Sequence, residues 1–138
     1  MANDWDRFRL YARGLSGNLL RGLRRATLYL EARVIEEAPV VTGNLRNSIS
    51  SYVIDAGSRS YGVVTVGSKY AGFVIRGTGI YGPRKQRIYP TTKKALAFSY
   101  GGVKIVVRSI KGMRPNPFTR RAWRKSKDKL RRMILGEI

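Results

Sequence analysis

The chain has no cysteine and no histidine among its 138 residues. Without cysteine there is no disulfide and no thiolate nucleophile, and without histidine the commonest group for proton transfer near neutral pH is missing. Zinc and iron sites would also lack their usual nitrogen and sulfur ligands. We therefore expect no catalytic residues, no bound cofactor and no metal, and we do not expect an enzyme.

Acidic residues are also scarce: eight Asp and Glu stand against 28 Lys and Arg, for a formal net charge of +20. Beyond Pro39 only three acids occur, and they are scattered: Asp55, Asp128 and Glu137. A positive excess of this size favours association with polyanions. We expect the chain to work close to nucleic acid, and the alternative is a solvated cationic surface.

Long apolar runs are absent as well, since no stretch of about 18 apolar residues could span a bilayer. The start, with Asp4, Trp5 and Asp6, lacks the charged segment and apolar block of a signal peptide. An apolar content of 43% in 138 residues is ordinary for one globular domain. We expect one domain, made in the cytoplasm and without a membrane partner.

Apolar residues recur every three or four positions over residues 5–37, which predicts a helix that ends before Pro39. Three glycines weaken this helix and predict a break near residues 13–18: Gly14, Gly17 and Gly22. Runs of β-branched and aromatic residues predict strands at 49–54, 61–66, 71–75, 93–98 and 103–107. Gly101-Gly102 is a hairpin signal between the last two strands, and the polar segment 77–90 predicts an exposed, mobile loop.

The last helix has clear boundary signals. Asn116 can cap its N-terminus, Pro117 suits its first position, and Gly136 can close it. Its apolar face comprises Phe118, Ala122, Trp123, Leu130, Met133 and Ile134.

Together these elements predict an α+β domain. We expect a long N-terminal helix and a C-terminal basic helix to pack on a curved, mostly antiparallel sheet of four to six strands. The single domain, residues 1–138, would comprise a helical arm (1–38), a sheet region with the exposed loop (39–110) and the basic helix (111–138).

The loop at 77–90 carries the first group of candidate functional residues. Arg84, Lys85 and Arg87 alternate with Tyr81 and Tyr89, a pattern that suits stacking on or clamping nucleic acid. Contact with a neighbouring subunit is an equal alternative. The loop also matches the dinucleotide-binding pattern G-x-G-x-x-G from residue 77 to 82, but a proline and cations follow where that mechanism requires a helix.

The second group covers the polar face of the last helix: Arg120, Arg121, Arg124, Lys125, Lys127 and Arg131. Such a face can follow phosphates, meet an acidic partner or lie on an anionic membrane. The membrane is the weakest of the three, because the apolar stripe of this helix is needed for packing.

Five short motifs follow one another between residues 38 and 118. They are Ala38-Pro39 with residues 42–49 (TGNLRNSI), Tyr70-Ala71, Arg76-Gly77-Thr78, Pro90 with residues 93–98 (KKALAF), and Pro115-Asn116-Pro117-Phe118. In this order they resemble the tail-completion, or head–tail joining (neck), proteins of long-tailed bacteriophages. The chain departs from that family at Val41, where Asp is common, at Thr119, where Leu is common, and before Gly77-Thr78, where a Glu is usual.

The resemblance implies a structural virion protein at the head–tail junction, assembled in the host cytoplasm. Such subunits form a ring, usually of six copies, that caps the tail tube. The implied partners are further copies of the chain, the tail tube protein, the head-completion or connector protein, and double-stranded DNA that passes through the ring without base-specific contacts. The alternative is a stand-alone basic nucleic-acid-binding protein, although no helix-turn-helix, zinc-finger or RNP signature supports it.

Overall fold

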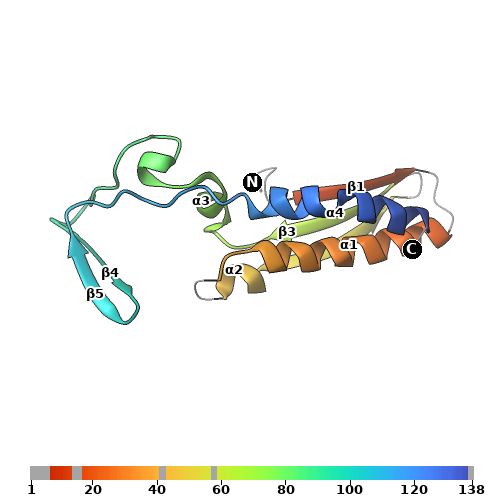
Figure 1. Cartoon of the computed structure of the whole chain (residues 1–138), viewed down its shortest axis with the longest axis horizontal. Coiled ribbons are helices and arrows are strands. Elements are labelled where there is room, and N and C mark those ends of the chain that lie inside the picture. The colour runs from red at the N-terminus through yellow and green to blue at the C-terminus, as the bar shows by residue number, and fades with distance from the viewer. Residues whose placement is uncertain (1–6, 14–16, 41–42, 57–58, 137–138) are drawn as a thin grey trace. The chain divides into compact units, whose positions relative to one another are not determined.

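The computed structural model describes residues 7–13, 17–40, 43–56 and 59–136 (Figure 1). The chain forms two compact units. The first draws on Met1–Ala71 and Pro117–Ile138, and the second comprises Gly72–Asn116. These boundaries differ from the predicted divisions after residues 38 and 110, because the C-terminal helix returns to pack against the N-terminal one.

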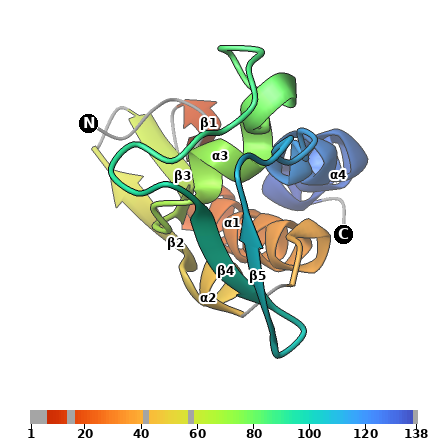
Figure 2. The same cartoon turned by 90° about the vertical axis from the view of Figure 1, so that its left-hand side faces the viewer.

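The first unit combines one sheet with two long helices. Its strands β1 (Arg7–Arg13), β2 (Ile49–Asp55) and β3 (Arg59–Val66) form an antiparallel sheet in the order β1-β3-β2. Helix α1 (Gly17–Glu37) packs against β2 and β3 and also against α4 (Phe118–Leu135) (Figure 2). The predicted α+β class and both helices are confirmed. However, α4 packs chiefly on α1 and not on the sheet.

The core lies between these elements. Leu23, Ala26, Leu30 and Val34 of α1 are fully buried, at the spacing of three or four that places side chains on one face of a helix. From α4 the buried side chains are Phe118, Ala122 and Leu130, and from β3 they are Val63, Val64 and Val66. The prediction that Phe118 opens the apolar face of the last helix is confirmed.

Residues Arg7–Arg13 were expected in the first helix but form β1, paired with β3 from Arg7 opposite Thr65 to Arg13 opposite Arg59. Their sequence, RFRLYAR, alternates between polar or amphipathic and apolar residues, which is the period of a strand. The three- and four-residue spacing that suggested a helix ran through this segment by coincidence. The predicted break agrees with the start of α1 at Gly17, while Trp5, Leu15, Val41 and Thr42 lie outside the described residues.

The expected strand at 71–75 is the short helix α3 (Ala71–Arg76). Periodicity cannot distinguish a strand from a buried helix in so short an apolar run. Gly77 ends the helix: its φ is 81° and its N–H donates to the Phe73 carbonyl at 2.9 Å. Glycine suits this left-handed position because it has no Cβ.

The second unit contains the 3₁₀ turn η2 (Gly79–Tyr81) and the hairpin of β4 (Leu96–Tyr100) and β5 (Val103–Val107). The hairpin turn is confirmed: Gly101 and Gly102 have φ of 58° and 80°, as a two-residue turn between twisted strands requires. Strand β4 begins at Leu96 and not at Lys93. A single sheet of four to six strands is not confirmed, because the described residues form one three-stranded and one two-stranded sheet.

The loop at 77–90 is largely exposed, as predicted, and its first residues make several main-chain hydrogen bonds. Its main chain is held by the segment at 110–113: Thr78 N–H donates to the Met113 carbonyl at 2.9 Å and Ile80 N–H to the Lys111 carbonyl at 2.8 Å. Ile88 and Ile110 exchange two further hydrogen bonds. The approach is so close that a Cβ on Gly79 would lie 1.9 Å from the Lys111 carbonyl oxygen. Glycine at position 79 therefore permits close contact between the main chains of the two segments.

Helix α4 begins one residue later than predicted, at Phe118, with Pro117 as its N-cap. Asn116 does not cap the helix. Its N–H donates to the Val74 carbonyl at 2.8 Å, and its Oδ1 is buried without a hydrogen-bond partner among the described residues. At the other end, the prediction for Gly136 is confirmed by its φ of 77° and its position at the C-cap. No helix in the described ranges is both long enough and apolar enough to cross a membrane.

Candidate polyanion and assembly surfaces

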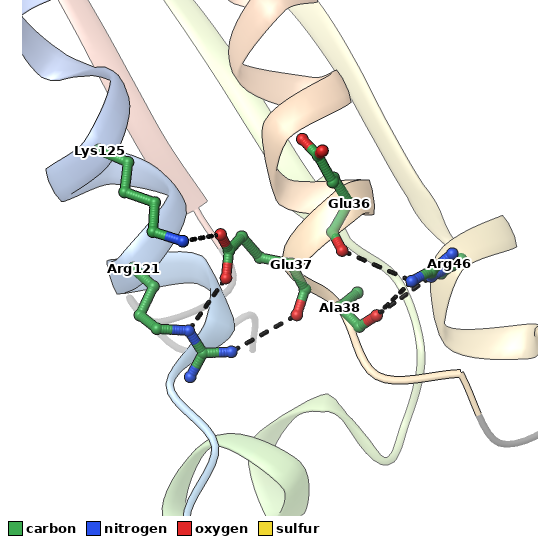
Figure 3. A network of polar contacts seen from close by, with 6 residues as sticks. All are labelled: Glu36, Glu37, Ala38, Arg46, Arg121 and Lys125. Atoms are coloured by element: carbon green, nitrogen blue, oxygen red, sulfur yellow. Dashed lines mark hydrogen bonds and ion pairs between the residues drawn. The ribbon is translucent and has the colours of Figure 1, made fainter.

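The predicted basic face of α4 divides into two groups. Arg120, Arg124, Lys127 and Arg131 are exposed on the helix surface. Arg121 is half-buried and Lys125 is exposed, and both bind the carboxylate of Glu37 at the end of α1 (Figure 3). Of the six residues predicted to form the basic face, these two therefore have charges that are partly neutralised within the unit.

Glu37 joins the two long helices. Arg121 Nε donates to Oε2 at 3.0 Å, and Lys125 Nζ donates to Oε1. The hydrogen bonds from Lys125 and then from Arg121 lower the pKa of Glu37 below its usual value, because they favour the charged carboxylate. The neighbouring Glu36 faces another direction and pairs with Arg33 of its own helix, Nη1 to Oε2 at 2.6 Å. No local sequence pattern indicates that α4 supplies the partners of Glu37.

Arg46, from the motif at residues 42–49, closes the same end of α1. Its Nε and Nη2 donate to the Ala38 carbonyl at 3.1 and 3.0 Å (Figure 3). The last turn of α1 contains no basic residue of its own. Arg46, from helix α2 (Asn44–Asn47), therefore supplies the positive charge that stabilises the carbonyl end of a helix. This segment of the resemblance has a structural role in the fold.

A hollow of about 220 Å³ lies between α1 and α4 beside the Glu37 ion pairs. Tyr29, Arg33, Glu36 and Glu37 line it from α1, and Ala122, Lys125 and Ser126 line it from α4. Arg33 and Lys129 both lie over the Tyr29 ring, at 5.3 and 4.7 Å from its centroid. No sequence motif predicts this hollow, because its two walls belong to the two ends of the chain.

The candidate loop residues lie in the second unit, and all five are exposed or nearly so. Arg87 Nε donates to the Ser109 hydroxyl at 2.9 Å, and Arg114 lies over the Tyr81 ring at 5.6 Å. These contacts hold the loop against the chain that follows β5. Arg84 and Lys85 are exposed beyond them, Lys85 with a φ of 51°. The structure therefore presents this group on a restrained loop.

The β4–β5 hairpin has one wholly apolar face. Cross-strand register places Leu96 opposite Val107, Phe98 opposite Ile105, and Tyr100 opposite Val103. These six side chains share one face because alternate strand residues point the same way. Phe98, Tyr100 and Val103 are 42%, 75% and 63% exposed, whereas Leu96, Ile105 and Val107 are half-buried. An apolar face this open is typical of an interaction surface.

Within the described ranges, no group of three or more His, Cys, Asp or Glu side chains lies close enough together to hold a metal ion. Comparison with family models, with curated proteins and with solved structures gives no match. The resemblance to tail-completion proteins therefore depends on the motifs alone.

Proposed function

We propose that the chain is a structural assembly subunit, a tail-completion or neck protein of a long-tailed bacteriophage. Copies would form a ring, by the resemblance six, that caps the tail tube and meets the head-completion or connector protein at the head–tail junction of the virion. Double-stranded DNA would pass through it. One observation carries the assembly role: three large side chains on the apolar face of the β4–β5 hairpin, Phe98, Tyr100 and Val103, are exposed to solvent.

An isolated two-stranded hairpin is marginally stable in water and is normally covered by further strands or a helix. Within the described part of the chain, β4 and β5 pair only with each other. We propose that a second copy of the chain covers the apolar face of the hairpin. A hairpin that docks on the three-stranded sheet of the next subunit would make a heterologous contact. Such contacts close into rings when the rotation permits. The predicted sheet of four to six strands would then be completed between two chains.

Charge supports a polyanion within this assembly. Each copy adds a formal +20, so a ring of copies repels itself unless anions neutralise it. Phosphates contacted by Arg and Lys supply that neutralisation without reading bases. Such contacts suit a duplex that must slide. The exposed residues Arg120, Arg124, Lys127 and Arg131, or the loop residues Arg84 and Lys85, are the candidates.

The assembly role is tested by two matched substitutions on β5. Val103 and Val106 are 63% and 60% exposed but lie on opposite faces of the hairpin. We expect Val103→Ser to abolish ring formation, or binding to the tail tube, in mass photometry. Val106→Ser should assemble as the wild type does, and circular dichroism would show that both variants fold. Equal assembly by the two variants would refute an apolar docking face.

DNA contact is tested by the salt dependence of binding to a random-sequence duplex. Each phosphate that the protein neutralises contributes about 0.9 to the slope of log K against log salt. If α4 faces DNA, we expect the triple substitution Arg120→Ser, Arg124→Ser and Lys127→Ser to reduce the magnitude of the slope by about two to three times this contribution of one phosphate. The triple substitution Arg84→Ser, Lys85→Ser and Arg87→Ser tests the loop in the same way. Unchanged slopes in both variants would exclude these residues as DNA contacts.

The exposed cations also support the alternative, a stand-alone nucleic-acid-binding protein. The two functions differ in oligomeric state. Tight, salt-dependent DNA binding by a chain that stays monomeric with the tail tube protein present would favour the alternative. Ring formation or binding at the end of the tube would favour the neck subunit.

A further inference from the structure

The described residues form four free sheet edges, and these edges differ in charge. The three-stranded sheet ends at β1 and β2, and the two-stranded sheet consists of β4 and β5. A free edge exposes main-chain N–H and C=O groups to another chain, and proteins commonly block such edges with charged residues or proline. Strand β1 (RFRLYAR) contains three arginines, and β5 contains Lys104. Strands β2 (ISSYVID) and β4 (LAFSY) contain no Lys, Arg or Pro.

The charge of the whole chain makes the two uncharged edges relevant to assembly. Lys and Arg account for 28 of the 138 residues, yet the only charged residue in β2 or β4 is Asp55, the last residue of β2. Two copies with a formal charge of +20 each repel one another. A contact between copies therefore costs least where neither surface contains a cation. Among the described sheet edges, β2 and β4 meet this condition.

The main chain of β2 presents free groups at every second residue. At one end of the β2–β3 pair, Gly67 N–H donates to the Ser48 carbonyl at 3.0 Å. At the other end, Ala56 N–H donates to the Arg59 carbonyl at 2.9 Å. In an antiparallel pair, residues alternate between bonding the partner strand and pointing away from it. Even-numbered residues of β2 therefore bond β3, and Val53 directs its N–H and C=O to the free edge.

Strand β4 presents its free groups in the same way. The two-residue turn Gly101-Gly102 joins Tyr100 to Val103, and a turn of this kind bonds its first residue to its fourth. By the same alternation, Ala97 and Ser99 direct their main-chain groups away from β5. Both residues are exposed. Each copy thus has one uncharged edge on its three-stranded sheet and one on its hairpin.

We propose that β4 of one copy pairs with the free edge of β2 in a second copy. This inference rests on the proposed ring and identifies the contact that builds it. The sheet then has five strands, in the order β1-β3-β2 followed by β4 and β5 of the partner, and its two outer strands are those that contain cations. The contact is heterologous because it joins different strands of the two copies. The apolar face of the hairpin adds side-chain packing to this main-chain contact.

Two proline substitutions on the hairpin form a matched test. Ala97 and Val106 lie opposite one another, and each directs its N–H away from the hairpin, Ala97 on the β4 edge and Val106 on the β5 edge. Proline removes that N–H and is tolerated on a free edge. In sedimentation velocity, we expect Ala97→Pro to remain monomeric under conditions in which the wild type assembles. Val106→Pro should assemble as the wild type does.

A third variant tests the partner edge. Val53→Pro removes an outward N–H of β2 and should also remain monomeric. An equimolar mixture of Val53→Pro and Ala97→Pro should form heterodimers and nothing larger. The first variant supplies an intact hairpin and the second an intact β2, while the two remaining edges are blocked. Heterodimer formation would also show that both variants fold.

The outcomes separate this contact from the proposed function. Assembly by Ala97→Pro, or equal loss of assembly in Val106→Pro, would overturn the pairing of β4 with β2 and leave the ring standing. A mixture that contains only monomers, with circular dichroism unchanged from the wild type, would do the same. Heterodimers from a wild type that forms open chains would support the contact and contradict the ring. A wild type that stays monomeric at every concentration, alone and with the tail tube protein, would overturn both.

Discussion

Gly22 offers the sharpest test of how the two long helices pack. On helix propensity alone, Gly22→Ala should stabilise α1 by up to about 1 kcal/mol, because alanine loses less backbone entropy than glycine. The structure predicts the opposite sign. A Cβ at this position would lie 2.7 Å from the Met133 carbonyl oxygen, 2.8 Å from that of Ile134 and 3.0 Å from Ile134 Cα.

The size of the destabilisation follows from what must move. All three atoms belong to the backbone of α4, so no side-chain rotation can relieve the overlap, and carbon atoms prefer separations of about 3.5–4.0 Å. The last turn of α4 must therefore retreat from α1. Overpacking of this kind costs about 1–3 kcal/mol. Taking the upper part of that range and subtracting about 1 kcal/mol of propensity, we expect a net destabilisation of about 2 kcal/mol.

Thermal and urea unfolding of the purified variants would measure this effect. About 2 kcal/mol should lower the melting temperature by roughly 5–10 °C in a chain of this size. Gly17→Ala is the matched control, since Gly17 is in the same helix and no atom of the described residues lies within 4 Å of its added Cβ. We expect that control to be neutral or slightly stabilising. A Gly22→Ala variant that melts at or above the wild-type temperature would show that α4 does not approach α1 this closely.

Two further substitutions test the first unit. A Cβ on Gly62 would lie 2.0 Å from Thr27 Oγ1, so Gly62→Ala should lower the free energy of unfolding by about 2–3 kcal/mol. Adding Thr27→Ala should recover part of that stability. Urea midpoints that show no recovery in the double variant would contradict this contact. Glu37→Gln should destabilise the fold at neutral pH. Because the folded pKa of Glu37 is lowered, its ion pairs stabilise the fold above the unfolded pKa, and this contribution disappears as the pH falls through the folded pKa. The difference between wild type and Glu37→Gln in urea titrations should therefore vanish in acid, and a difference that persists there would have another origin.

Local signals in the sequence predicted several elements well. The three- and four-residue spacing from Leu23 to Val34 marked the buried face of α1, and Gly101-Gly102 marked the hairpin turn. Gly136 marked the end of α4. Each depends on the conformation or spacing of residues close together in the chain, which is why the sequence suffices to predict it.

Other expectations were wrong where two interpretations of a short segment were possible. Arg7–Arg13 and Ala71–Arg76 are each seven residues or fewer, and such runs fit more than one periodicity. In the first, pairing with β3 decides the outcome; in the second, the C-terminal glycine ends a helix. The loop at 77–90 forms main-chain hydrogen bonds with the segment at 110–113, and the composition of the loop does not reveal them.

The candidate functional residues show the same division. Counting Lys and Arg predicted the positive charge and located it on α4 and in the loop, but counting could not separate free cations from paired ones. Arg121 and Lys125 are partly occupied by Glu37, more than eighty residues earlier in the chain. The hollow with Ser126 and Arg33 is likewise formed only when α4 packs on α1.

The sequence by itself determined the charge, the absence of histidine and cysteine, and the C-terminal ends of both long helices, since composition and local signals carry that information. Only the tertiary structure decided which cations are paired, which glycines permit close contact, and which apolar face of the hairpin is left uncovered. These features depend on contacts between segments that are far apart in the sequence. The energy of such a contact depends on both segments together, so the local pattern of either one does not predict it.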